Sequence, residues 1–168
     1  MKEIEAKLTY IDRAQLTGIL KQLGCTKRES VGLKDIYYSP DGDRMDNVKT
    51  ILRIREITGK PTELTYKGPC PKDKGVWERT EITTEISSPN EMQEILNNLR
   101  MNLIKTNETA REYWELDDLE IVFMDFIKPQ KLEIIEIEGP SKEKVESFIH
   151  ELGDSVKVVG EEVFKSFD

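Results

Sequence analysis

The first residues of the chain alternate charged and aliphatic side chains. Within residues 2–8, Glu3, Glu5 and Lys7 occupy every second position, with aliphatic residues between them. Side chains of a β-strand point alternately to its two faces, so this stretch predicts a strand with one ionic face and one apolar face. A solvated surface strand has the same pattern, and 35% of the residues are charged. One such segment therefore does not decide between a surface face and an ionic interior.

The same alternation recurs along the chain, which is harder to explain by surface exposure. Charged side chains, acidic, basic or both, share one strand face in these segments, mostly opposite aliphatic residues: 52–56 (Arg53, Arg55), 63–67 (Glu63, Lys67), 79–86 (Arg79, Glu81, Glu85), 105–114 (Lys105, Arg111) and 135–139 (Glu136, Glu138). Ordinary surface strands rarely keep charges so regularly on alternate positions. The repetition predicts a barrel or deeply cupped sheet whose interior is ionic and holds a highly charged ligand.

Strands dominate the expected organisation, and three helices interrupt them. We expect strands at 2–10, 34–38, 49–57, 62–68, 77–87, 103–115, 119–126 and 131–139, with turns at 41–42, 58–61 and 117–118 and a longer loop at 68–76. Asp12, Ser88 and Ser141 precede apolar residues at helical spacing and predict three helix starts. The pattern predicts an α+β barrel-like fold, and the length of 168 residues favours one domain over 1–168.

Composition excludes several classes of function. The net charge of −8 argues against a nucleic-acid binder. No apolar run approaches the roughly 20 residues of a membrane span, and no secretory signal pattern opens the chain. Cys25 and Cys70 are isolated, which favours a reduced, cytoplasmic setting. The single histidine, His150, falls on the expected last helix and argues against zinc or histidine-dyad catalysis. Carboxylates would hold any metal, which indicates Mg²⁺ or Mn²⁺.

Six elements follow one another in an order that matches a known family. They are Glu3-x-Glu5-x-Lys7, Leu52-Arg53-Ile54-Arg55, Leu64-Thr65-Tyr66-Lys67-Gly68-Pro69, Arg79-x-Glu81, Arg111-Glu112-Tyr113 and Glu136-Ile137-Glu138. The set resembles the CYTH superfamily, the triphosphate tunnel metalloenzymes, over nearly the whole chain. The third element closely resembles the class IV adenylate cyclase branch. The resemblance implies a closed eight-stranded antiparallel β-barrel with flanking helices, which encloses a triphosphate tunnel.

The chain departs from the family pattern at a few positions. Thr83 stands where the family often has a second glutamate after Glu81, and Lys105 lies six residues before Arg111 instead of close to it. Asp125 matches the aspartate that usually precedes the final acidic pair, at a spacing about one residue longer. Residues 128–131 replace the usual Gly-Leu-Gly turn.

The resemblance implies a role for each matching residue. Five cations would carry catalysis and hold phosphate: Lys7, Arg53, Arg55, Lys67 and Arg111; Arg79 and Lys105 would also bind substrate. Metal ligands would be Glu3, Glu5, Glu136 and Glu138, with Glu81 and Asp125 completing a second site if two ions bind. A divalent ion, Mg²⁺ or Mn²⁺, neutralises charge that develops on the transferred phosphoryl group.

Two enzyme classes share this machinery. A class IV adenylate cyclase, a phosphorus–oxygen lyase, converts ATP to cyclic AMP and pyrophosphate. A triphosphatase, an acid anhydride hydrolase, cleaves thiamine triphosphate, inorganic triphosphate or a nucleoside triphosphate. The 64–69 element favours the cyclase. A non-catalytic polyphosphate- or nucleotide-binding module is a third reading, and the four glutamates argue against it. We expect no nucleic-acid or membrane partner, and the protein to be a monomer or a homodimer.

Overall fold

A computed structural model describes residues 2–42, 49–69 and 75–159 of the protein. Its elements are β1 Lys2–Tyr10, α1 Arg13–Gln22, β2 Thr26–Ser39, β3 Ile51–Ile57, β4 Thr62–Lys67, β5 Trp77–Ile86, α2 Pro89–Asn98, β6 Asn102–Leu116, β7 Leu119–Lys128, β8 Leu132–Glu138, α3 Lys142–Leu152, a 3₁₀ turn Gly153–Ser155 and β9 Val156–Val158. The strands form one antiparallel sheet in the order β5-β4-β3-β2-β6-β7-β8-β1-β9.

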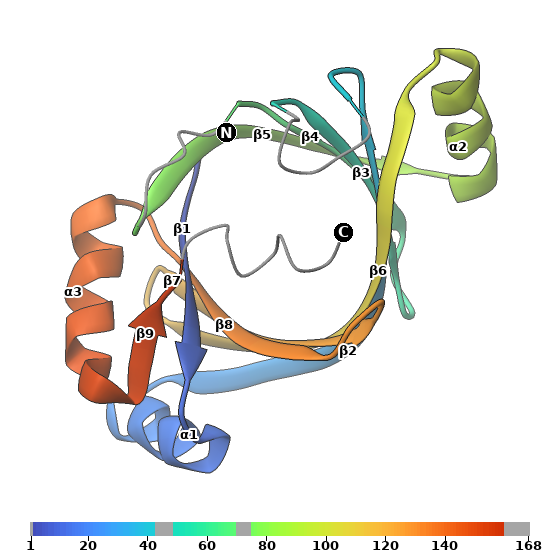
Figure 1. The fold of residues 1–168 in the computed structure, drawn as a ribbon. Coiled ribbons are helices and arrows are strands. Elements are labelled where there is room, and N and C mark those ends of the chain that lie inside the picture. Colours follow the sequence, from blue (N-terminus) through green and yellow to red (C-terminus); the bar gives the residue numbers. More distant parts are fainter. Residues whose placement is uncertain (1, 43–48, 70–74, 160–168) are drawn as a thin grey trace.

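The sheet closes on itself because β5 also pairs with β1. Lys2 lies opposite Thr80 and Glu5 opposite Trp77 in that pairing, whereas β9 pairs with the following residues of β1, Leu8–Tyr10. Figure 1 shows the resulting ring of strands viewed through its opening. The predicted closed eight-stranded antiparallel barrel with three flanking helices is therefore confirmed.

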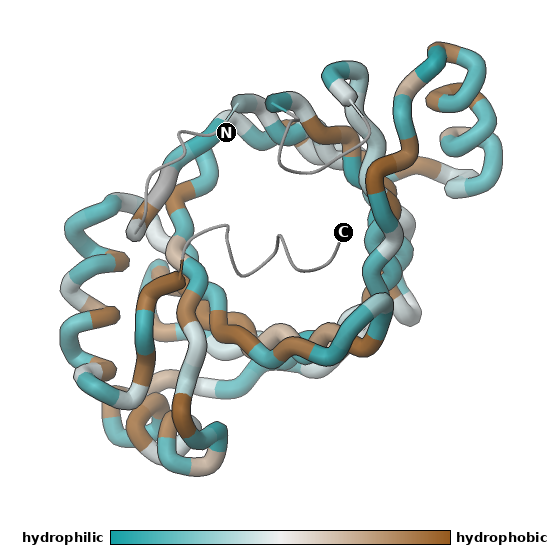
Figure 2. Tube along the Cα trace, in the orientation of Figure 1, coloured by the Kyte–Doolittle hydropathy of each residue, from teal (hydrophilic) through white to brown (hydrophobic). Residues whose placement is uncertain are grey.

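Apolar side chains on the outer face of the barrel form two buried clusters beneath the helices, and a third cluster on β7 and β8 faces the interior. α1 and α3 cover the outer face of β1, β7 and β8 through a buried cluster that includes Leu20, Phe123, Ile135 and Phe148. On the other side α2 packs through Leu96 against β2 and β3. Figures 1 and 2 show these helices outside the ring and the alternation of hydrophilic and hydrophobic residues along the strands. Burial of one apolar face fixes the strand register and leaves the other face inside the barrel.

Local signals placed the helix starts and turns correctly. The side chains of Asp12, Ser88 and Ser141 accept hydrogen bonds from backbone N–H groups three residues later, at 2.7, 3.3 and 3.2 Å. Gly59 and Asp117 have left-handed φ values of 76° and 53° in the expected β3–β4 and β6–β7 turns. The 41–42 turn and the 68–76 loop continue into residues 43–48 and 70–74, which lie outside the described residues, as does Cys70.

Two strands differ from the sequence expectation. β2 begins at Thr26 instead of residue 34, because the charged segment before Leu33 pairs with β6 along its whole length. β9 was not expected, since its three residues carry no periodic signal. Among the described residues, no helix has the length and apolar character needed to cross a membrane.

Candidate functional site

The charged residues of the alternating strands meet on the inner face of the barrel. Cross-strand partners place Arg79 opposite Glu3, Glu136 opposite Lys7, and Glu138 opposite Glu5. Directly opposed residues of an antiparallel pair project to the same face, so these side chains share the interior. The same register sets Asp35 against Arg55 and Lys67 against Glu81 on the other strands.

One side of the interior is rich in carboxylates, and we call it the acidic wall. It consists of Glu3 and Glu5 on β1, Glu120 on β7, and Glu136 and Glu138 on β8. The Lys7 ammonium contacts the carboxylate of Glu5 and lies 2.7 Å from that of Glu136. Arg79 donates to Glu3 at 2.8 Å and lies 3.5 Å from Glu5.

The acidic wall holds more negative charge than its neighbours neutralise. Burial and the nearby charges of Glu3 and Glu136 raise the pKa of Glu138 to about 7. Burial also raises the pKa of Glu3 and of Glu120. The pKa of Glu5 moves the other way: burial opposes the shift, but the charges of Lys7 and Arg79 lower it well below its usual range. Crowded carboxylates of this kind favour a bound cation.

The opposite side of the interior is rich in guanidinium and ammonium groups, and we call it the cationic wall. It consists of Arg53 and Arg55 on β3, Lys67 on β4, and Lys105 and Arg111 on β6. Asp35 of β2 accepts two hydrogen bonds from Arg55, at 2.7 and 2.8 Å, and lies 3.7 Å from Arg111. Lys105 stacks over the ring of Tyr37 with its ammonium 5.7 Å from the ring centre.

Lys67 connects the two walls. Its ammonium lies 2.6 Å from Glu81 of β5 and 3.2 Å from Glu3 of the acidic wall. Burial and the charge of Arg53 lower the pKa of Lys67, and burial and the charge of Arg55 lower the pKa of Arg53. The shifts reflect burial first and then repulsion among neighbouring cations, and an anion in the barrel would relieve that repulsion.

Four buried polar atoms facing the interior have no hydrogen-bond partner in the described part of the chain. They are Arg53 Nε, Arg111 Nε, Asn107 Oδ1 and Thr109 Oγ1. The two arginines are each 7% exposed. Since buried polar groups in folded proteins are nearly always paired, these atoms indicate a ligand or water in the interior. All four belong to β3 and β6, on the cationic side.

The structure brings together all but one of the predicted site residues. The interior contains Glu3, Glu5, Lys7, Arg53, Arg55, Lys67, Arg79, Glu81, Lys105, Arg111, Glu136 and Glu138. The predicted place of Asp125 among them is wrong. Its carboxylate accepts from Arg13 of α1 at 2.6 and 2.8 Å on the outer face, and Phe126 takes the neighbouring inward position.

Sequence reasoning missed several interior residues. Asp35 alternates with Tyr37 in a segment that was expected to be a strand, so its parity was a usable signal. Glu120 lies between Leu119 and Ile121, and the apolar residues that follow occupy both faces of β7, which hides the direction of its side chain. Asn107 and Thr109 are uncharged and gave no signal in a search for charged faces.

The residues of the acidic wall fit a hard divalent cation by the chemistry of their donors. Mg²⁺ and Mn²⁺ prefer carboxylate oxygens, and Glu138 has the raised pKa expected of a carboxylate that lacks a counter-charge. As arranged, no three His, Cys, Asp or Glu side chains of the described residues converge as metal ligands. The Lys7 ammonium lies between Glu5 and Glu136, so an ion bound to both would require Lys7 to turn away.

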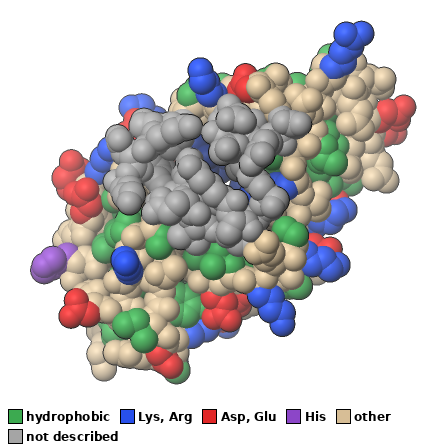
Figure 3. All heavy atoms as spheres, in the orientation of Figure 1, with side chains coloured by type: hydrophobic (Ala, Val, Ile, Leu, Met, Phe, Trp, Pro, Cys, Tyr) green, Lys and Arg blue, Asp and Glu red, His purple; other side chains and the backbone are tan. Residues whose placement is uncertain are grey.

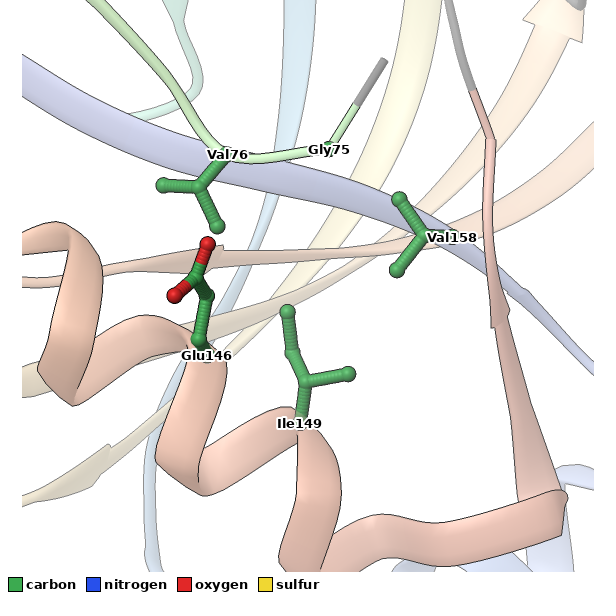
Figure 4. A pocket seen from close by; sticks show the side chains of 5 residues that line it. All are labelled: Gly75, Val76, Glu146, Ile149 and Val158. Atoms are coloured by element: carbon green, nitrogen blue, oxygen red, sulfur yellow. The ribbon is translucent and has the colours of Figure 1, made fainter.

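A second cavity, outside the barrel, has a different character. It measures about 370 Å³ and is lined by Gly75 and Val76, by Glu146 and Ile149 of α3, and by Val158 of β9 (Figure 4). Its described lining residues include one carboxylate, that of Glu146, and no cation, so they do not favour a phosphate. Figure 3 shows acidic and basic side chains interspersed around the edge of one face of the molecule.

Comparison with known proteins agrees with this architecture. A profile of the CYTH domain matches residues 1–162. The chain belongs to the CYTH domain family. Comparison with curated proteins found no match.

Solved structures with the same fold include proteins of Pyrococcus horikoshii and Hippeastrum. The PH1012 protein of Pyrococcus horikoshii superposes with a TM-score of 0.76 at 19% identity, over 92% of this chain and 94% of that one. The PH1819 protein of the same organism gives 0.69 at 25% identity, over 91% and 93%. HpAC1 of Hippeastrum, named as a candidate adenylyl cyclase with a dominant triphosphatase activity, gives 0.71 at 19% identity, over 98% and 94%. At these low sequence identities, the comparison shows that this CYTH protein shares the fold of those structures.

Proposed function

We propose that this CYTH protein binds a triphosphate inside its barrel and processes it with Mg²⁺ or Mn²⁺. The observation that carries the proposal is the division of the interior into an acidic and a cationic wall. Arg53 and Arg111 each have a buried Nε without a partner among the described residues, next to other cations. An anionic chain along this wall would pair both atoms and relieve the repulsion between the cations.

The side chains divide the work between them. Arg53, Arg55 and Arg111 would hold phosphate oxygens through their planar forks, and Lys67 would add a point charge between the walls. Such contacts accelerate a reaction to the extent that they strengthen as charge develops in the transition state. When bound, a divalent ion at Glu3, Glu5, Glu136 and Glu138 would supply neutralisation of charge on the phosphoryl group. Asp125 takes no part, since it pairs with Arg13 outside the barrel.

The reaction we propose is cyclisation of ATP to cyclic AMP and pyrophosphate. In that reaction the ribose 3′-hydroxyl attacks the α-phosphorus and pyrophosphate leaves. The support is the resemblance of residues 64–69 to the class IV adenylate cyclase branch. Hydrolysis, in which water attacks the terminal phosphorus, is the alternative outcome for the same walls.

One incubation tests the proposal. The purified protein is mixed with ATP, thiamine triphosphate or tripolyphosphate and with Mg²⁺ or Mn²⁺, and the products are separated by chromatography. Cyclic AMP with pyrophosphate supports the cyclase; ADP with phosphate, or preferential loss of tripolyphosphate, supports a triphosphatase. Absence of any product, together with tight tripolyphosphate binding, would indicate a non-catalytic binding module.

A matched pair of variants ties the activity to the barrel interior. Arg53→Ala removes a cation from the cationic wall. Lys34→Ala removes a cation from the outer face of β2, where Lys34 pairs with Glu56 at 2.9 Å and its side chain is 45% exposed. Loss of activity in Arg53→Ala alone is the expected result. Equal activity in both variants would show that the reaction does not take place at the cationic wall.

A further inference from the structure

We propose that Asn107 and Thr109 form a subsite that recognises hydroxyl or amino groups of the substrate, so that the tunnel selects an organic triphosphate over inorganic tripolyphosphate. This inference rests on the proposed function, because it assumes that the phosphates lie along the cationic wall. It adds two residues that determine the choice between an organic and an inorganic triphosphate.

Both residues lie on the inner face of β6, between two members of the cationic wall. Asn107 is opposite Asp35 of β2, and Thr109 is opposite Phe126 of β7. Lys105 precedes them and Arg111 follows them at the same alternating spacing. A phosphate chain held by Arg111 would therefore have these two side chains beside it.

Their polar atoms are buried and unsatisfied. Asn107 is 4% exposed and Thr109 is 2% exposed, and neither Asn107 Oδ1 nor Thr109 Oγ1 has a hydrogen-bond partner in the described ranges. An amide oxygen accepts hydrogen bonds and does not donate them, whereas a hydroxyl does both. Ionised phosphate oxygens are acceptors, so they cannot satisfy Asn107 Oδ1. With the amide oriented as it is in the structure, the partner of that atom donates a hydrogen, as a sugar hydroxyl, an amino group or a water does.

The surroundings of Thr109 also change from charged to apolar. Val122, Met124 and Phe126 of β7 and Ile134 of β8 form a buried cluster on the inner face. Met124 is opposite Arg111, and Phe126 is opposite Thr109. A triphosphate chain gains nothing from such neighbours, whereas the uncharged ring of an organic substrate does. The cluster thus continues the cationic wall on the side where the organic part would lie.

A trapped water that bridges Asn107 and Thr109 is the competing explanation. The variant Thr109→Val separates the two, because valine keeps the shape and removes the hydroxyl. If the hydroxyl holds a structural water, its removal lowers the melting temperature and leaves ligand preference unchanged. If it is kept for the substrate, its removal leaves the melting temperature equal or higher, because an unpaired buried polar group is lost.

The experiment measures binding by calorimetry with Mg²⁺ present. The two ligands are an ATP analogue and a tripolyphosphate analogue in which methylene groups replace both bridging oxygens, so that neither is turned over. The parent should bind the ATP analogue more tightly. Thr109→Val and Asn107→Leu should each weaken binding of the ATP analogue by about tenfold. Each should change the affinity for the tripolyphosphate analogue by less than about twofold. Thr84→Val, on the exposed outer face of β5, is the control and should change neither.

Three results would overturn the inference. Equal affinity of the parent for both analogues would remove the selectivity and leave the proposed triphosphate function intact. If Thr109→Val weakens binding of both analogues equally, or lowers the melting temperature without changing the ratio of the two affinities, the hydroxyl has a structural role. Failure of the parent to bind either analogue would refute the proposed function itself, and the inference with it.

Discussion

The two walls of the barrel interior are built by the same strand alternation but have opposite electrostatics. On the acidic wall, carboxylates outnumber their cationic partners, and the pKa of Glu138 rises to about 7. On the cationic wall, Asp35 is shared by Arg55 and Arg111, and two guanidinium nitrogens have no partner among the described residues. Each wall is thus incomplete alone. The difference supports the proposal that the barrel binds two ligands of opposite charge side by side, a divalent cation and a polyanion.

Metal removal gives the largest expected effect, because it leaves the acidic wall with unneutralised charge beside the substrate. We expect excess EDTA to abolish turnover of any triphosphate, and Mg²⁺ or Mn²⁺ to restore it. A product assay before and after chelation measures this. Full turnover in excess EDTA would show that the carboxylates of the acidic wall only stabilise the fold. The difference in charge between the two walls would then play no part in catalysis.

Removal of a cation from the cationic wall should come next. Arg53→Ala and Lys67→Ala each delete a charge from a polar interior and no apolar group from a core, so the fold should remain. The loss of a contact that tightens in the transition state should cost about 2–4 kcal/mol in kcat/KM. Steady-state kinetics with circular dichroism measures both properties. Values close to the parent in both variants would contradict the role of this wall.

Removal of the carboxylate within the cationic wall tests stability. Asp35 is buried, and although burial opposes the shift, the charge and hydrogen bonds of Arg55 lower its pKa well below the usual range. Asp35→Asn leaves buried arginines uncompensated and should destabilise the protein by about 3 kcal/mol. Urea unfolding at pH 7 gives the value. In the parent, the contribution of Asp35 is present at neutral pH and is lost as the pH falls through the lowered folded-state pKa.

Removal of a carboxylate charge from the acidic wall should stabilise the protein, whereas removal of the Asp35 charge should destabilise it. The folded-state pKa of Glu138, about 7, exceeds its ordinary value of 4.5. Its stabilising contribution is therefore full below about pH 4.5 and is lost as the pH rises through about 7. We expect Glu138→Gln to stabilise the metal-free protein on the order of 1 kcal/mol at pH 8, after allowance for solvent screening, and to change little at pH 4.5. Thermal unfolding of parent and variant at the two pH values checks this, and a destabilised variant at pH 8 would contradict the crowding of carboxylates.

The sequence predicts the walls where charge alternates strictly with aliphatic residues. In β1, β3 and β8 this alternation identified the interior residues, because one buried outer face fixes the register. The prediction failed on β7, where Ile121 and Phe123 face outward and Val122 and Met124 face inward, so that both faces are apolar. Asp125 was assigned there by spacing alone, and a shift of one residue reverses the face.

Uncharged interior groups could not be predicted in this way. Asn107 and Thr109 have the right parity on β6, but their significance comes from burial without a partner among the described residues, which only three-dimensional packing reveals. The position of the charged residue Glu120 also required the three-dimensional structure, because its place beside Glu138 follows from the pairing of β7 with β8.

A crystal structure of the protein with Mn²⁺ and the methylene analogue of tripolyphosphate tests the central claim most directly. We expect the anomalous signal of manganese at the carboxylates of Glu3, Glu5, Glu136 or Glu138. The phosphonate oxygens should lie within hydrogen-bond distance of Arg53 and Arg111, with both Nε atoms paired. Analogue and metal bound outside the barrel, with the interior ion pairs unchanged, would contradict the account.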